Sequence, residues 1–301
     1  MRLTPGALIL RFRQRFGHGL RVAWWRDVVR PKILRAAPVP GTVDPFAEMH
    51  VLTSESDWLN LVWTLKSFYR VAPRRYRLVI HEDGSLGEEA RGHLERMFPD
   101  ARMIRREAAD AEVLGALADN PRCRALRETN ALSLKVFDFS HYLESDRMIL
   151  MDSDILFYAK PEVLIARIED PSYRLNSVNG DVSSAYTVDP AVVRDRMGFD
   201  MVEGYNSGLG LIHRDSMRLD WIEEFLGLPG IIGHFWRIEQ TLYALFSSRF
   251  GCELLPSAYD VYLTPGIGDR PSRHYVGAIR HLMYGEGMRR LARETDILKP
   301  E

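Results

Sequence analysis

Short apolar runs alternate along the chain with longer segments in which apolar residues recur at helical spacing. A run of four to eight apolar residues bounded by turn residues predicts a strand, and apolar residues three and four apart predict a helix. The predicted strands cover 49–54, 76–84, 101–106, the run ahead of Asp152, 206–214 and 252–256. The predicted helices cover 56–71, 87–98, 128–143, 161–168, 215–227 and 236–250.

This alternation predicts an α/β fold with a mostly parallel central sheet and helices on both faces. A proline- and glycine-containing stretch, APVPGTVDP at 37–45, precedes the first strand and is typical of a linker. We therefore expect an extension and linker over 1–45, followed by a single domain over 46–301. In open sheets of this kind, ligands bind beyond the carboxyl ends of the strands, so functional residues are expected there.

Charge is distributed unevenly. Residues 1–35 hold nine basic side chains and one acid. The chain has 40 basic and 41 acidic residues in all, so residues 36–301 hold 31 basic and 40 acidic side chains. Apolar residues share possible helix faces here: Leu8, Ile9, Phe12 and Phe16, then Leu20, Trp24 and Val28, with Trp25 and Val29 beside them. A basic amphipathic helix with tryptophans suits an anionic membrane surface. The alternative is a helix that packs on the body of the protein and keeps its arginines in solvent.

Composition narrows the class of protein. With 46% hydrophobic and 27% charged residues, the chain resembles an ordinary globular protein. No apolar run approaches the roughly 18 residues that a membrane span needs, and the N-terminal apolar core is too short for a secretory signal. Two cysteines give neither a disulfide framework nor a CxxC metal site. We expect a cytoplasmic protein, in possible peripheral contact with the inner face of the membrane, and no nucleic-acid partner.

The stretch MILMDSDILF, from Met148 to Phe157, places two aspartates one residue apart at the end of an apolar strand. Burying a carboxylate is costly unless a partner compensates its charge. Asp152 and Asp154 can reach one hard cation if the chain turns between them, and Mg²⁺ or Mn²⁺ with such oxygen ligands is commonly shared with phosphates. The alternative for an isolated DxD is a solvated acidic turn.

This segment resembles the metal-binding strand of GT-A-fold glycosyltransferases, and four further segments resemble the retaining enzymes of glycosyltransferase family eight. Lys135 stands where that family has a basic residue on the helix before the DxD strand, and Asn206-Ser207-Gly208 matches its Asn-small-Gly turn. Glu239-Gln240 resembles its Asp-Gln pair. The last segment matches a His-x-x-Gly-x-x-Lys motif, with arginine for lysine, at His274, Gly277 and Arg280. The order and approximate spacing agree over roughly 48–285.

The resemblance implies a GT-A-like fold, with a Rossmann-like nucleotide-binding half and an acceptor half. It implies that Asp152, Asp154 and His274 bind Mn²⁺, or Mg²⁺, and that the cation stabilises a diphosphate leaving group. Residues expected to contact the donor are Thr53, Ser54, Lys135, Ser153, Asn206, Ser207, Gly208 and Gly277. Catalysis is expected to involve Glu239 on the donor sugar, Gln240 at the anomeric carbon and Arg280 on the departing phosphates.

These positions also have ordinary structural interpretations: Lys135 as a solvated helix lysine, His274 as a structural histidine, Arg280 as a surface ion pair. Glu239-Gln240 would then be an exposed first helical turn, where acids are favoured. The implied activity is transfer of a sugar from a nucleoside diphosphate, most simply UDP, to a glycan, lipid-linked or protein acceptor with retention of configuration. The alternatives are a nucleotidyltransferase, although TSESDW lacks a Gly-rich basic loop, and a non-catalytic protein of this fold that binds nucleotide sugars or glycans.

Overall fold

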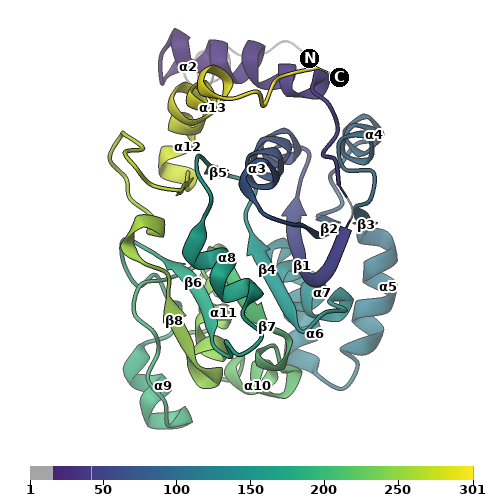
Figure 1. Cartoon of the computed structure of the whole chain (residues 1–301). Coiled ribbons are helices and arrows are strands. Elements are labelled where there is room, and N and C mark those ends of the chain that lie inside the picture. Colours follow the sequence, from purple (N-terminus) through teal and green to yellow (C-terminus); the bar gives the residue numbers. More distant parts are fainter. Residues whose placement is uncertain (1–15, 42, 301) are drawn as a thin grey trace, which may run out of the picture.

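The computed structural model describes residues 16–41 and 43–300, and a seven-stranded sheet forms its centre (Figure 1). The strand order is β3-β2-β1-β4-β7-β6-β8, and β5 and β9 form a separate two-stranded sheet. The strands are β1 Val43–Thr53, β2 Arg75–Glu82, β3 Arg102–Ile104, β4 Arg147–Met151, β5 Ile155–Phe157, β6 Asn176–Gly180, β7 Tyr205–His213, β8 Cys252–Leu254 and β9 Ser272–His274.

The central sheet is mostly parallel, which confirms the predicted fold class. β1 pairs in parallel with β2 and β4, β2 with β3, and β6 with β8. β7 alone in this sheet runs against its neighbours β4 and β6 among the described residues. The carboxyl ends of β1 and β4 consequently lie at the same edge of the sheet, and the chain leaves that edge through Ser54 and Asp152.

Helices cover both faces of the sheet. The longer ones are α3 Trp58–Val71, α4 Glu88–Met97, α5 Arg106–Ala116, α6 Pro121–Thr129, α7 Leu134–Tyr142, α8 Glu162–Glu169, α9 Pro190–Met197, α10 Leu219–Phe225 and α11 Ile238–Phe250. Side chains alternate along β4, so that Ile149 and Met151 join the core with α3, α4 and α8, while Met148 and Leu150 join the core with α5, α6, α7, α10 and α11. A strand buried on both faces is typically apolar without interruption, as β4 is from Met148 to Met151.

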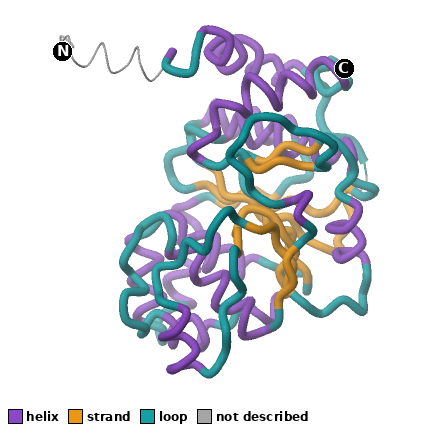
Figure 2. Tube along the Cα trace, turned by 90° about the vertical axis from the view of Figure 1, so that its left-hand side faces the viewer, coloured by secondary structure: helices purple, strands orange, loops and turns teal. Residues whose placement is uncertain are grey.

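The N-terminal and C-terminal helical segments pack together at one end of the molecule, as both views show (Figure 1; Figure 2). The first comprises α2 Leu20–Trp24 with a continuous π turn, Trp25–Val29, and a 3₁₀ turn, Arg30–Arg35. The second comprises α12 Arg280–Leu282, a π turn Met283–Met288, and α13 Arg289–Glu294. Short 3₁₀ turns elsewhere are Ala131–Ser133, Arg214–Ser216, Ser257–Tyr259 and Gly277–Ile279.

The N-terminal segment has one face in the protein core and another in solvent. Trp25, Val29 and Ile33 are buried in the core that contains α3. Leu20 and Trp24 are exposed. The predicted face through Leu8, Ile9 and Phe12 lies outside the described residues, and no helix of the described residues is long and apolar enough to cross a membrane.

One sequence prediction of secondary structure was wrong. The segment 128–143 is not one helix, because α6 ends at Thr129 and α7 begins at Leu134. Asn130 separates them: its backbone is extended and its side chain accepts a hydrogen bond from the Leu132 amide. A strand was also missed at β6, whose polar Asn176, Ser177 and Asn179 are fully buried.

Candidate functional site

A cavity of about 940 Å³ opens at the edge of the sheet where β1 and β4 end. It has the size of a pocket for a nucleotide or cofactor. All residues predicted from the sequence to form the site line it: Thr53, Ser54, Lys135, Asp152, Ser153, Asp154, Asn206, Ser207, Gly208, Glu239, Gln240, His274, Gly277 and Arg280. Segments more than 200 residues apart in the chain therefore meet at one place.

Asp152, Asp154 and His274, here called the Asp–Asp–His triad, converge at the floor of this cavity. Each offers one ligand atom, and these atoms all lie within 4.8 Å of one another. Strand pairing places the histidine: β5 and β9 are antiparallel with Ile155 opposite His274, so the residue after Asp154 is in register with the histidine. The His274 Nε2 atom lies 3.0 Å from Asp154 Oδ1 and 3.7 Å from Asp152 Oδ2.

Asp154 is the buried member of the aspartate pair, with 3% of its surface exposed. Burial alone would raise its pKa, but the adjacent His274 and the Arg280 guanidinium, 2.6 Å away, lower the pKa of Asp154 to about 2. Burial would lower the pKa of His274, and the Asp154 carboxylate outweighs this effect and raises it. The Arg280 guanidinium and the His274 ring thus face a buried carboxylate, and this burial excludes the solvated-turn alternative for Asp154.

Asn206 and Gly208 fix the orientation of His274. Asn206 Oδ1 lies 3.1 Å from His274 Nδ1, and an Nδ1–H donor to this oxygen holds the ring with Nε2 directed at the aspartates. Gly208 makes room for the ring, since a Cβ atom there would lie 2.3 Å from His274 Cε1. Such outer contacts commonly orient metal-binding histidines.

Lys135 is buried between two carboxylates and is therefore not a solvated helix lysine. Its Nζ atom lies 2.8 Å from Asp152 Oδ1 and 3.0 Å from Glu239 Oε1, and it donates to the Ser207 carbonyl oxygen at 3.0 Å. Burial would lower the pKa of Lys135, but Asp152 and Glu239 raise it, so the ammonium stays charged. Burial raises the pKa of Glu239, which also accepts a hydrogen bond from the Ser207 hydroxyl at 3.0 Å.

Several of the predicted residues face the cavity without a partner of their own. The buried Thr53 hydroxyl has no hydrogen-bond partner among the described residues, and the Gln240 side chain likewise bonds to none of them. A Cβ added to Gly277 would meet no atom within 4 Å, so the backbone there is open to a ligand. Ser153 contributes its carbonyl oxygen to a hydrogen bond from Thr64.

The lining residues that the sequence analysis missed include two acids and two aromatic residues: Asp57, Asp181, Phe235 and Trp236. Asp57 pairs with Arg280 at 2.9 Å, and Asp181 accepts from Asn206 at 2.9 Å. Phe235 and Trp236 are exposed beside Gln240, with 45% and 68% of their surfaces accessible. Asp57 follows the first strand and could have been found by its position there, whereas Asp181 follows the strand that the sequence did not reveal.

The arrangement suits a hard divalent cation. Two carboxylates and one imidazole are a donor set that Mn²⁺ accepts, and Arg280 and Lys135 add fixed positive charge at the same place. Positive groups around an open cavity can bind the phosphates of a ligand, and an adjacent buried carboxylate, Glu239, can accept hydrogen bonds from hydroxyl groups.

No protein-family model and no curated protein match the sequence. Solved structures do match the fold. Mouse xyloside xylosyltransferase 1 in its apo form has a TM-score of 0.53 at 12% identity, over 79% of this chain and 99% of that one. The bifunctional glycosyltransferase WbbM has a TM-score of 0.50 at 12% identity, over 81% of this chain and 48% of that one.

The galactosyltransferase LgtC, in complex with donor and acceptor sugar analogues, has a TM-score of 0.49 at 15% identity, over 76% of this chain and 87% of that one. The likeness to the first two structures agrees with the mostly parallel sheet and its covering helices. The chain has the fold of the GT-A glycosyltransferases, as the resemblance of its motifs predicted.

Proposed function

We propose that the protein is a metal-dependent glycosyltransferase that moves a sugar from a nucleoside diphosphate, most simply UDP, to an acceptor with retention of configuration. The convergence of the Asp–Asp–His triad at the floor of a large cavity is the observation that carries this proposal. The similarity in fold to known glycosyltransferases supports it, and so does the order of the matched motifs along the chain.

Asp152, Asp154 and His274 would hold Mn²⁺ or Mg²⁺, which when bound neutralises the diphosphate and stabilises it as a leaving group. Arg280 already contacts Asp154 and would turn toward the phosphates, where its planar guanidinium can donate two hydrogen bonds. Gly277, whose Cα faces open space, would let the backbone approach the same phosphates. Thr53 and Ser54, at the end of β1, would contact the nucleoside, with Ser153 beside the phosphates.

Glu239, Lys135 and the segment Asn206-Ser207-Gly208 at the start of β7 would bind the donor sugar. The amide of Gln240 would face the anomeric carbon on the side opposite the leaving group. A neutral amide is a poor nucleophile, so we favour attack from the front face, in which the leaving phosphate accepts the proton of the acceptor hydroxyl. Gln240 would then stabilise the positive charge that develops on the sugar.

The acceptor would enter past Phe235 and Trp236, because these exposed aromatic side chains lie at the cavity beside Gln240. Aromatic faces are suited to packing against the apolar face of a sugar ring. The acceptor class is a glycan, a lipid-linked molecule or a protein, and the proposed compartment is the cytoplasm.

A thermal-shift panel tests the proposal. Nucleoside diphosphates and their sugars are added with and without Mn²⁺ to the wild-type protein and to the Asp152→Asn/Asp154→Asn variant. A ligand at 100 times its Kd stabilises the native state by about 2.7 kcal/mol, which is readily measured as a rise in Tm. We expect one nucleoside diphosphate to stabilise the wild type only when metal is present, and the variant not at all.

The sugar that stabilises most identifies the donor, and slow metal-dependent release of free nucleoside diphosphate from it would distinguish an enzyme from a binding protein. A nucleoside triphosphate as the best ligand, with release of pyrophosphate, would favour the nucleotidyltransferase alternative. If no nucleotide or metal shifts the Tm of the folded wild type, the glycosyltransferase proposal is wrong.

A further inference from the structure

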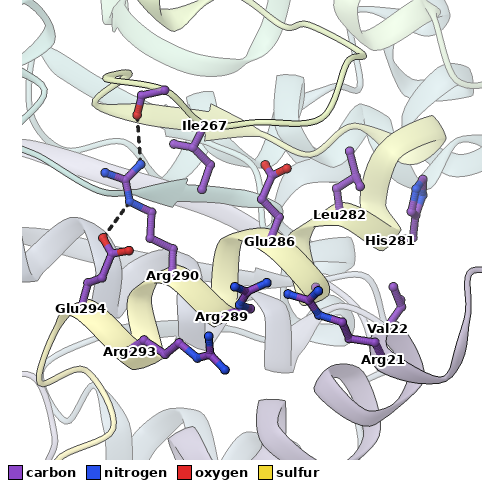
Figure 3. Close-up of a pocket in the computed structure, with 12 residues that line it drawn as sticks. Arg21, Val22, Ile267, His281, Leu282, Glu286, Arg289, Arg290, Arg293 and Glu294 are labelled. Carbon is purple, nitrogen blue, oxygen red and sulfur yellow. Dashed lines mark hydrogen bonds and ion pairs between the residues drawn. The ribbon is translucent and has the colours of Figure 1, made fainter.

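A second cavity, of about 630 Å³, lies between the N-terminal and C-terminal helical segments (Figure 3). Four arginines line it: Arg21 from α2, and Arg289, Arg290 and Arg293 from α13. Consecutive residues of the chain line the two cavities: Arg280 lines the cavity of the candidate functional site, and His281 and Leu282 line the second cavity.

The carboxylates at this cavity are already engaged. Glu294 pairs with Arg290 at 3.0 Å, and Glu286 accepts from the Gly266 amide at 2.7 Å and pairs with Arg273. Glu294 therefore neutralises Arg290, and Glu286 neutralises Arg273.

The other three arginines form no ion pair or hydrogen bond with any residue of 16–41 or 43–300. The guanidinium groups of Arg21 and Arg289 point toward one another across the cavity (Figure 3). Like charges that converge without a carboxylate between them repel, and an anion bound between them would relieve this repulsion. Arginine is well suited to phosphate, to which it can donate two parallel hydrogen bonds.

An exposed apolar row lies on the same N-terminal segment as Arg21. Leu20, Trp24 and Val28 are 75%, 50% and 48% exposed, and their spacing of four places them on one side of the helical run. The opposite side, with Trp25 and Val29, is buried in the core, so the row cannot turn inward without unpacking the segment. Water-exposed large apolar side chains beside basic ones indicate a surface for an amphipathic partner.

We propose that this end of the molecule binds an anionic phospholipid bilayer, with lipid phosphates in the cavity of Arg21, Arg289 and Arg293 and with Leu20, Trp24 and Val28 in the interface. A lipid bilayer accounts for both features together, because it offers phosphates and an apolar layer next to each other. Tryptophan is favoured at this depth, since its ring is apolar and its N–H is polar. Basic side chains near such a surface are attracted by its negative potential. The inference does not depend on the proposed enzymatic activity.

Vesicle co-sedimentation of the full chain tests this inference. The probes are vesicles of phosphatidylcholine alone and vesicles with 30% phosphatidylglycerol, at low and at high salt. We expect the wild type to bind the anionic vesicles at least tenfold more tightly than the neutral ones, with binding weakened at high salt. The Arg289→Glu/Arg293→Glu variant should lose most of the preference for anionic lipid, and Leu20→Ser/Trp24→Ser should weaken binding at both salt concentrations.

The matched control is Arg194→Glu/Arg196→Glu on α9, a helix at the opposite end of the molecule (Figure 1), which should bind as the wild type does. All substituted side chains except Arg289 are exposed, and a Tm within about 2 °C of the wild type would show that each variant is folded. Equal binding to neutral and anionic vesicles would overturn the inference, and so would wild-type binding by both test variants. Protection of Tm by inorganic phosphate alone, with no vesicle binding, would assign the cavity to a free anion and also overturn it.

Discussion

The Asp–Asp–His triad and a second cluster among the described residues both contain residue types that bind metal ions, and they differ in whether those residues converge. The second cluster consists of Glu48 and His50 on β1 with His81 on β2, here called the Glu–His–His cluster. Its members are 1%, 0% and 1% exposed. They form a line: Glu48 Oε2 lies 3.3 Å from His50 Nε2, and His50 Nδ1 lies 3.0 Å from His81 Nε2.

The protein itself engages both Glu48 and His50 and one nitrogen of His81, while His81 Nδ1 has no hydrogen-bond partner among the described residues. Glu48 also pairs with Arg77 at 2.9 Å and accepts from the Glu144 amide at 2.9 Å, and the His81 ring packs on Phe139. By contrast, the ligand atoms of the Asp–Asp–His triad meet at one point beside an open cavity, and no other group of described residues does so. The comparison shows that convergence and access distinguish a metal site from a structural network, and that residue type does not.

The largest expected effect comes from removing the positive charge of Lys135, which lies between Asp152 of the Asp–Asp–His triad and Glu239. Lys135→Met leaves Asp152 and the buried Glu239 facing each other without a cation, which typically costs about 3–5 kcal/mol of unfolding free energy. Urea unfolding measures this loss. Lys160→Met, at an exposed lysine paired with Glu162, should change the free energy by less than about 0.5 kcal/mol.

Mn²⁺ sharpens this test. The cation would replace part of the missing charge, so it should stabilise Lys135→Met more than it stabilises the wild type. A Lys135→Met protein as stable as the wild type in the absence of metal would contradict the view that Lys135 neutralises the two carboxylates.

A smaller effect is expected from a methyl group that breaks the convergence of the triad. A Cβ at position 208 would lie 2.3 Å from His274 Cε1 and 2.8 Å from Asn206 Oδ1, so the imidazole must turn away from the aspartates. Displacing a ligand together with its supporting hydrogen bond should weaken Mn²⁺ binding on the order of 100-fold for Gly208→Ala. Isothermal titration with Mn²⁺ measures this change.

The control is Gly92→Ala in α4, where an added Cβ meets nothing within 4 Å. Its metal affinity should equal that of the wild type. Unchanged affinity in Gly208→Ala would show that His274 is not a ligand, and that only the two aspartates take part in binding.

The sequence could place some of the candidate site residues together because Thr53, Ser54 and Asp152 lie where strands end. The apolar run before Asp152 identified β4, and a parallel sheet gathers such strand ends at one edge. The distant partners, His274 and Arg280, were found only through the resemblance of ordered motifs. Nothing local indicates that β9 pairs with β5, because each strand has three residues and carries no periodic pattern.

β6 shows why other parts escaped prediction. Its sequence, NSVNG, reads as a turn, yet the strand lies inside the sheet between β7 and β8. Tertiary hydrogen bonds compensate its polar side chains: Asn176 donates to Ser216 and Ser247 and accepts from the His213 amide, and Asn179 accepts from the Leu209 amide. Patterns of apolar residues cannot reveal a strand whose burial depends on partners elsewhere in the chain.

The smallest expected effect is on the pH dependence of stability, which depends on the Glu–His–His cluster. Burial, and then the neighbouring His50, lower the pKa of His81 well below its usual value of about 6.5, so the folded protein holds His81 neutral while the unfolded chain takes up a proton. The stabilisation is therefore present above pH 6.5 and is lost as the pH falls, by up to about 2 kcal/mol between pH 7 and pH 5 for one such histidine.

His81→Leu, an apolar residue of similar size, should remove this share of the pH dependence. Any constant cost of the substitution cancels when the unfolding free energies at pH 7 and pH 5 are compared within each protein. The same variant should bind Mn²⁺ as the wild type does, because His81 lies outside the triad. If the pH dependence of stability is unchanged in His81→Leu, His81 has the same protonation state in the folded and the unfolded chain. If this variant loses Mn²⁺ affinity, the two clusters are coupled through the sheet. Separate responses to acid and to metal would establish that one sheet supports a closed polar network and an open ligand site independently.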